Sequence, residues 1–229
     1  MVTHENRFDP ELLQARWLLG GVGPDELTNQ AEIALTQGFD GSALRQLVGL
    51  THPTLRDLGT LPDRAFLEMG LKPLDKDQAV DLLVARGLPK VSGPLSSLLE
   101  KFPSFSKRWK EHVAYWAGEP AGDYNDMAEF VHFVVEDLYE KGALDETRRV
   151  FECLERLFAK GNQDDRNLIG LGFFETLQNF ASWRPYGNTV FEQFFGPMSQ
   201  QVWKEISQMW RGKSSLMDVI RSERNTPQD

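Results

Sequence analysis

Carboxylates are the residues of this sequence whose clustering most clearly suggests a function. Nine of them lie between Glu119 and Glu146, where Lys141 is the only cation, so most of the formal net charge of −9 is concentrated in this segment. Such a concentration favours a basic protein partner, because opposite charge accelerates encounter. It disfavours nucleic acid, whose phosphates are bound by Lys and Arg. The densest basic run, Lys107-Arg108-Trp109-Lys110, could pair with the acidic segment within the fold.

The acidic segment contains one expected helix, Tyr124–Glu140, whose two faces differ. At about 100° per residue, four apolar residues fall within one arc and form the expected core face: Met127, Val131, Val134 and Leu138. The opposite face gathers the predicted partner-binding residues: Asp126, Glu129, Phe133, Glu136, Asp137 and Glu140. An exposed aromatic ring among carboxylates would give an interface an apolar anchor with a charged rim. The alternative is a solvated face in which the preceding module or a loop covers Phe133.

The other chemically capable residues form no catalytic or metal-binding pattern. The four histidines are far apart and lack metal-ligand spacing: His4, His52, His112 and His132. The single cysteine, Cys153, cannot form an intramolecular disulfide and is expected to be a small buried residue. We therefore predict no metal and no cofactor.

The apolar stretch from Asn167 to Asn179 contains Gly170 and Gly172, a pattern that superficially suggests a phosphate-binding loop. That fingerprint needs a preceding strand and a third glycine in register, and both are lacking. We instead expect these glycines to allow close approach of a neighbouring helix. Glu175 in the same stretch would need a partner if buried, and Arg166 or Arg184 could provide it. One carboxylate alone is weak evidence for acid–base chemistry, so no enzyme is predicted.

Helical periodicity runs through almost the whole chain, and no segment alternates convincingly as a strand would. The sequence therefore predicts an all-α protein: a small N-terminal helical module at residues 1–88, then an antiparallel helical bundle at 94–222. A segment rich in Gly, Pro and Ser, Gly87–Pro103, is the candidate junction. Expected helices include a first one begun by Asp9-Pro10 and longer ones at 124–141, 144–160, 164–180 and 198–210.

Composition supports a globular protein with a real core. The chain has 229 residues, 41% of them hydrophobic and 26% charged. No apolar run is long enough to span a membrane, and the N-terminus lacks an apolar signal core, so a soluble, cytoplasmic protein is expected. The many aromatic residues are expected in the core, because base stacking would require more Lys and Arg.

The stretch from about Phe105 to Gly212 resembles a bacterial helical domain family of unknown function. The likeness is carried mainly by Lys141-Gly142-Ala143-Leu144-Asp145, by Asn167 to Asn179, by Phe195-Gly196-Pro197-Met198-Ser199, and by Trp203 to Trp210. Leu12 to Leu71 looks like a short helical module that precedes varied domains in other bacterial proteins. Small acidic helical proteins of this type often look like immunity proteins encoded beside polymorphic or contact-delivered toxins.

The leading functional hypothesis is a non-enzymatic bacterial immunity protein that occludes a cognate toxin through its acidic surface, the toxin presenting a basic one. The alternative is a scaffold or interaction module whose helices form a groove for a peptide or partner helix. An enzyme centred on Glu175 would require that residue to line an accessible pocket with a second polar group. The oligomeric state is left open by the sequence.

Overall fold

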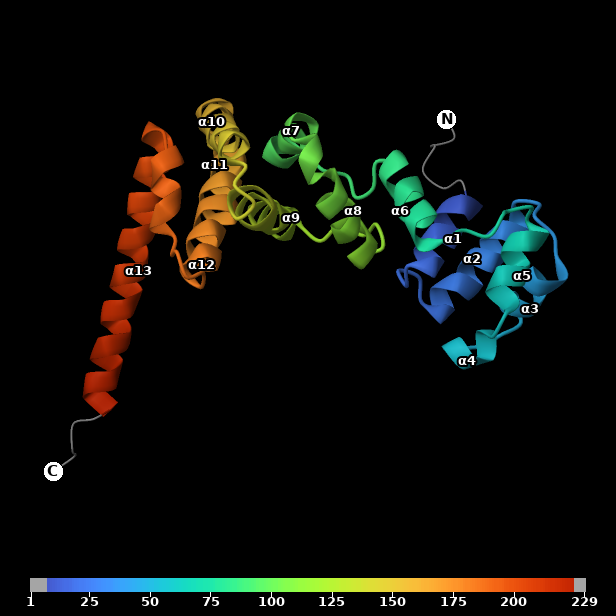
Figure 1. Cartoon of the computed structure of the whole chain (residues 1–229). Coiled ribbons are helices and arrows are strands. Elements are labelled where there is room, and N and C mark those ends of the chain that lie inside the picture. Colours follow the sequence, from blue (N-terminus) through green and yellow to red (C-terminus); the bar gives the residue numbers. More distant parts are fainter. Residues whose placement is uncertain (1–7, 225–229) are drawn as a thin grey trace. The chain divides into compact units, whose positions relative to one another are not determined.

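A computed structural model describes residues 8–224, with side chains for residues 8–210. All regular secondary structure in the described part is helical, as predicted (Figure 1). The described residues form two units. One comprises the chain up to Lys90 together with Trp109–Ala121, and the other comprises Val91–Arg108 together with the chain from Gly122 onward.

The first unit is built from short helices around a small hydrophobic core. Its helices are α1 (Pro10–Leu18), α2 (Pro24–Thr36), α3 (Ser42–Val48), α4 (Leu55–Leu58), α5 (Leu61–Glu68), α6 (Lys76–Ala85) and the part of α8 (Ser106–Tyr115) that begins at Trp109. The Asp9 side chain accepts a hydrogen bond from the Leu12 backbone N–H, which confirms the predicted start of the first helix. Leu27, Leu44 and Phe66 lie in its core.

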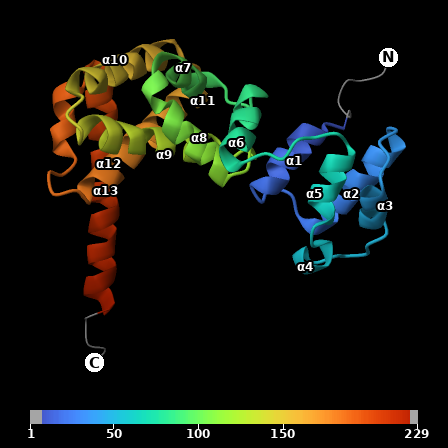
Figure 2. The same cartoon turned by 45° about the vertical axis from the view of Figure 1, so that its right-hand side comes forward.

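The second unit contains the longer helices and two π-helical segments, and Figure 2 shows α9 to α13 gathered within it. Its elements are α7 (Gly93–Lys101), η2 (Pro103–Phe105), the start of α8, α9 (Asp123–His132), η3 (Phe133–Tyr139), α10 (Leu144–Lys160), α11 (Gln163–Asn167), η4 (Leu168–Glu175), α12 (Thr176–Ser182), η5 (Thr189–Phe194) and α13 (Pro197–Arg224). The two π-helices are η3 and η4. Each continues from an α-helix, so the expected helices at 124–141 and 164–180 each change geometry part-way.

Aromatic side chains fill the core of the second unit. Phe151 alone lies within 6.4 Å, centroid to centroid, of five other phenylalanine rings: Phe173, Phe174, Phe191, Phe194 and Phe195. Tilted and edge-on pairs at these distances add to the energy of burial itself. Cys153, two residues after Phe151, is buried, as predicted for a small apolar residue. The phenylalanines are therefore core residues, as expected.

The division between the units differs from the sequence-based ranges of 1–88 and 94–222. The first boundary, at Lys90–Val91, falls inside the candidate junction, but residues 109–121 belong to the first unit. Close backbone approach explains this assignment. A Cβ added to Gly118 would lie 3.0 Å from Leu83, and one added to Gly21 would lie 2.5 Å from the Cβ of Ala117. Such contacts between residues distant in sequence are not visible in a local composition change.

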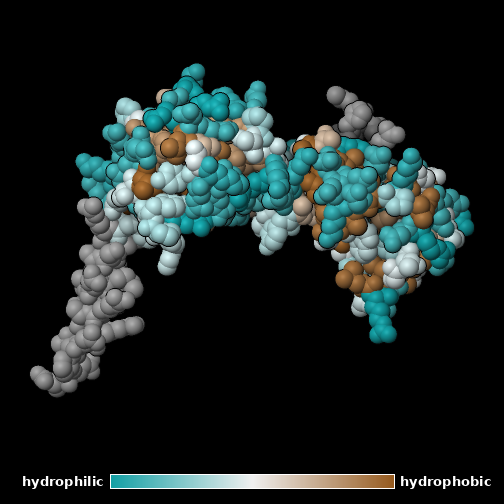
Figure 3. Space-filling view, in the orientation of Figure 1, coloured by the Kyte–Doolittle hydropathy of each residue, from teal (hydrophilic) through white to brown (hydrophobic). Residues whose placement is uncertain are grey.

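Hydrophilic residues cover most of the surface seen in Figure 3, and apolar residues are exposed in small patches. Trp183 and Tyr115 are the most exposed of the large apolar side chains described. Among the residues that the structure describes, no helix is both long and apolar enough to cross a membrane.

Candidate functional site

The structure corrects two of the six residues predicted to bind a partner. Phe133 is 1% exposed and Asp126 is 4% exposed, so neither forms part of an open surface. The ring of Phe133 packs 5.2 Å from that of Phe105 and 5.6 Å from that of Phe130. A helical wheel shows only which residues of one helix share a face. It cannot show that another element, here η2 with Phe105, covers the face opposite the predicted core. Phe133 is therefore a core residue and not an interface anchor.

The other four predicted residues form a network of ion pairs centred on Arg108. Its Nε donates to Asp137 at 2.6 Å, one terminal nitrogen donates to Glu129 at 3.1 Å, and the other donates to Glu136 at 2.9 Å. The planar guanidinium can bind three carboxylates at once, because its N–H donors point in fixed, different directions. Arg108 belongs to the basic run that could pair with the acidic helix, so this pairing is confirmed for Arg108.

Additional groups complete the network around the same carboxylates. Arg184 donates to Glu136 at 2.6 Å and lies 3.6 Å from Glu140, while Lys141 donates to Asp137 at 2.6 Å. The Tyr186 hydroxyl donates to Glu140 at 2.6 Å. The carboxylates Glu129, Glu136, Asp137 and Glu140 therefore face Arg108, Arg184 and Lys141, and most of their charge is balanced within the second unit. A partner would encounter much less negative charge here than the sequence alone suggests.

The network favours the ionised form of two of its carboxylates, Glu129 and Asp137. The hydrogen bond from His132 is the main cause of a lowered pKa at Glu129, with Arg108 adding to it against the effect of burial. Burial would raise the pKa of Asp137, but the hydrogen bonds from Lys141 and Arg108 outweigh it and the pKa is lowered. Burial and the hydrogen bond to Glu140 raise the pKa of Tyr186 above its ordinary range. These shifts move the pKa values of Glu129 and Asp137 further below neutral pH and that of Tyr186 further above it. They stabilise fixed charges and do not give any of the three groups a pKa near neutral pH, as acid–base catalysis would require.

Glu175 is half-buried. Of its two suggested partners, Arg184 pairs instead with Glu136 and Glu140, and Arg166 donates to the backbone oxygen of Phe158. Within residues 8–210, no three His, Cys, Asp or Glu side chains are grouped in a way that could hold a metal ion.

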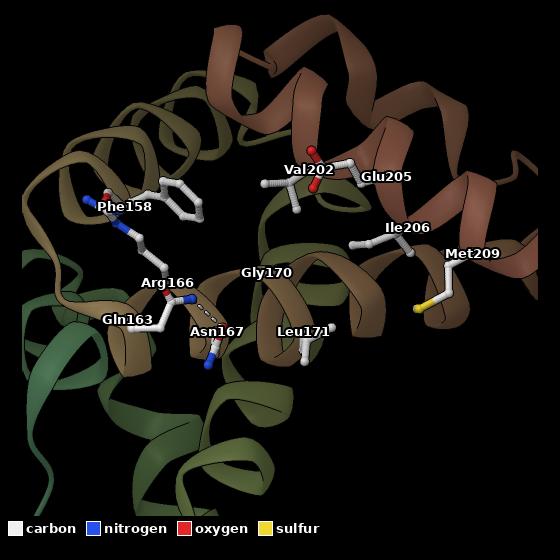
Figure 4. A pocket seen from close by; sticks show the side chains of 10 residues that line it. All are labelled: Phe158, Gln163, Arg166, Asn167, Gly170, Leu171, Val202, Glu205, Ile206 and Met209. Atoms are coloured by element: carbon white, nitrogen blue, oxygen red, sulfur yellow. Dashed lines mark hydrogen bonds between the residues drawn. The ribbon is translucent and has the colours of Figure 1, made fainter.

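A cavity of about 460 Å³ opens between α11, η4 and α13, and we call it the η4–α13 groove (Figure 4). It is lined by Phe158, Gln163, Arg166, Asn167, Gly170, Leu171, Val202, Glu205, Ile206 and Met209. Val202 and Ile206 are buried, while Leu171 and Met209 are 45% and 41% exposed. The groove therefore has a largely apolar lining with two large apolar side chains open to solvent.

Both walls of the groove follow helical spacing. The α13 residues lie at i, i+3, i+4 and i+7: Val202, Glu205, Ile206 and Met209. The residues of α11 and η4 lie at i, i+3, i+4, i+7 and i+8: Gln163, Arg166, Asn167, Gly170 and Leu171. Residues so spaced form one stripe of an α-helix, and the stripe continues from α11 into the π-helical η4, because Gly170 and Leu171 line the same cavity. Two helices thus present one stripe each to the same opening, which is the arrangement that a third helix can fill.

A second hollow, of about 600 Å³, lies on the other side of α11, and we call it the acidic hollow. Its lining includes Asp123, Asp164, Asp165 and the exposed ring of Tyr124, and Asn167 lines both this hollow and the η4–α13 groove. None of the three aspartates forms an ion pair with a side chain that the structure describes. The groove and the hollow are therefore neighbouring openings with different chemistry.

Residues 95–211, just over half of the chain, match the family model described as a domain of unknown function, DUF7674. The chain belongs to the DUF7674 family. The DUF7674 match confirms the expected membership of the C-terminal half in a family of unknown function. It contains the whole Arg108 network and all residues of the η4–α13 groove. Nothing in it connects the family with immunity proteins.

The curated proteins and the solved structures gave no significant match to this DUF7674 chain. The family match also does not extend to Leu12–Leu71, so the resemblance of that module stays a prediction. The groove is not among the features that the sequence predicts. The available signal was the mixture of polar and apolar residues within each stripe, such as Glu205 between Val202 and Ile206.

Proposed function

We propose that this DUF7674 protein is a non-enzymatic protein-binding module whose η4–α13 groove receives an amphipathic helix of a partner protein. The observation that carries the proposal is the pair of helical stripes that line one groove, each with a half-exposed apolar residue, Leu171 or Met209. Amphipathic helices bind such grooves through apolar residues spaced three and four apart. This is the scaffold alternative of the sequence analysis, now with a defined surface.

The exposed apolar residues of the groove set the scale of the energy that a bound helix would gain from them. Full burial of a Leu or Met side chain contributes about 1.5–3 kcal/mol, so covering the exposed parts of Leu171 and Met209 contributes about 1 kcal/mol each. A partner helix gains a similar amount from its own apolar residues. These contacts together contribute about 4 kcal/mol before the cost of association, so stable binding also requires contacts to the remaining residues of both stripes.

The test compares Leu171→Glu with the matched control Leu144→Glu. Both leucines are 45% exposed in the second unit, but only Leu171 lines the groove. The full chain is used to capture partners from the native cell by quantitative mass spectrometry. The proposal expects a partner that wild type and Leu144→Glu retain and that Leu171→Glu loses at least about tenfold, because the bound helix would have to remove water from the new carboxylate and would lose an apolar contact. Equal retention by all three proteins would contradict it.

Toxin neutralisation is the second candidate function, and the acidic hollow beside the groove favours it. A basic toxin could engage the unpaired carboxylates of Asp123 and Asp164 while one of its helices occupies the groove. The acidic face of α9 and η3 is no longer assigned to this contact, since its carboxylates are already paired. Co-expression with the protein encoded beside this chain tests the idea. Restored growth that depends on Leu171 supports neutralisation, whereas toxicity unrelieved by wild type rejects it.

A further inference from the structure

The charge around the η4–α13 groove is uneven, and this restricts the kind of helix that fits it. Within the groove, Arg166 and Glu205 contribute one charge of each sign. Three carboxylates line the acidic hollow without a described cationic partner: Asp123 at the start of α9, and Asp164 and Asp165 on α11. The hollow therefore decides the charge preference of this surface.

Helix termini reduce the negative charge of the hollow but do not cancel it. Ser92 and Gly93 begin α7, Asp123 begins α9 and Asn162 precedes α11, so the N-terminal ends of these helices line the hollow. Each helix N-terminus carries about half a positive charge, whereas each carboxylate carries a full negative charge. Three carboxylates against three termini leave the hollow negative. The ring of Tyr124, 52% exposed, adds a face that attracts cations.

We propose that the helix bound in the η4–α13 groove carries Lys or Arg along the flank that faces Asp123 and Asp164. This rests on the proposed function and adds to it the charge pattern of the partner. The proposal rests on the position of Asn167, which lines both openings. Because the two openings meet at this residue, a helix bound in the groove has one flank next to the hollow. Long basic side chains can reach across α11 while their stems stay on its surface.

The test is a selection from a displayed library of amphipathic helical peptides of about 18 residues. The apolar stripe is fixed and both flanks are randomised, and the target is the immobilised full chain. Peptides that also bind Leu171→Glu are removed. The proposal expects Lys and Arg to be enriched on one flank only. Enriched peptides should bind about three- to tenfold more weakly to the double variant Asp123→Asn, Asp164→Asn, as the loss of two partly solvated ion pairs implies.

The control is Asp145→Asn, which removes an exposed carboxylate from the first turn of α10, outside both openings. It should leave affinity unchanged. If no peptide depends on Leu171, the groove itself is not a helix site and the proposed function fails. If peptides depend on Leu171 but show no basic flank, or bind the double variant as well as wild type, the groove stands and this inference is overturned. Asp165 is left intact because its side chain accepts the backbone N–H of Asn162 at the start of α11.

Discussion

Replacing Arg108 with methionine should destabilise the second unit by about 3 kcal/mol at neutral pH. The change keeps most of the apolar stem and removes the hydrogen bonds to Glu129, Glu136 and Asp137. Removing one partner of a buried ion pair costs about 3–5 kcal/mol, and losing an exposed pair costs about 0–1 kcal/mol. The four side chains of this cluster are 22–33% exposed, so the cost falls between these limits. Three carboxylates left without their central cation move the value toward the upper limit.

Native-state hydrogen exchange of the amides in α9 and η3 measures this loss where it occurs, without assuming that both units unfold together. The matched control is Lys110→Met in the same helix. Lys110 pairs only with Asp81 among the described residues, and these side chains are 46% and 60% exposed. Its loss should change the free energy of opening by less than about 1 kcal/mol.

Lowering the pH tests the ionic origin of the effect. Because the pKa values of Glu129 and Asp137 are lowered in the folded protein, their contribution is complete above the ordinary values of 4.5 and 3.8. It is lost as the pH falls through the folded-state values. The difference between wild type and Arg108→Met should therefore narrow below about pH 4. A loss at neutral pH no larger than that of the control, or a difference that stays constant on acidification, would refute the reasoning.

Three further substitutions test the packing around the candidate site. Phe133→Ala should lower the free energy of unfolding by about 3–5 kcal/mol in a denaturant titration, and an effect below about 1 kcal/mol would show that Phe133 is not a core residue. Gly170→Ala should be neutral or stabilising by up to about 1 kcal/mol, because its Cβ would meet only Val202, at 3.9 Å. Gly172→Ala should be destabilising, because its Cβ would lie 2.9 Å from Leu168 and 3.3 Å from Met127; the reverse order of melting temperatures would contradict this. Glu155→Ala should destabilise α13 by about 1–2 kcal/mol, seen as faster exchange of its first amides, while Glu155→Gln keeps part of the contact.

Local patterns in the sequence predict most of the helices but not what covers them. Asp9-Pro10 specifies the start of α1 because a cap and a fixed φ act over a few residues. The change from α- to π-helix at Phe133 has no comparable local signal. Likewise, the wheel places Phe133 opposite the first core face, and only the fold shows that Phe105 packs against it.

The candidate site depends even more on long-range contacts. The carboxylates of the Arg108 network are visible in the sequence as an acidic helix, and their pairing with Arg108 follows from simple charge balance. The groove is different, because its walls come from residues 163–171 and 202–209. Each wall alone reads as an ordinary amphipathic helix. Their alignment depends on the connection through α12 and η5, which no local rule specifies.

The contact between Glu155 and the start of α13 also gives a way to observe the groove without a label. The Glu155 carboxylate accepts the backbone N–H groups of Met198 and Ser199 at 3.1 and 2.8 Å. α13 forms one wall of the groove, and Phe158, one turn after Glu155 on α10, lines the same groove. A helix bound in the groove would therefore contact both α10 and α13, the two elements that the Glu155 hydrogen bonds join. The exchange rates of these two amides therefore provide a built-in reporter of occupancy, readable in the unmodified protein.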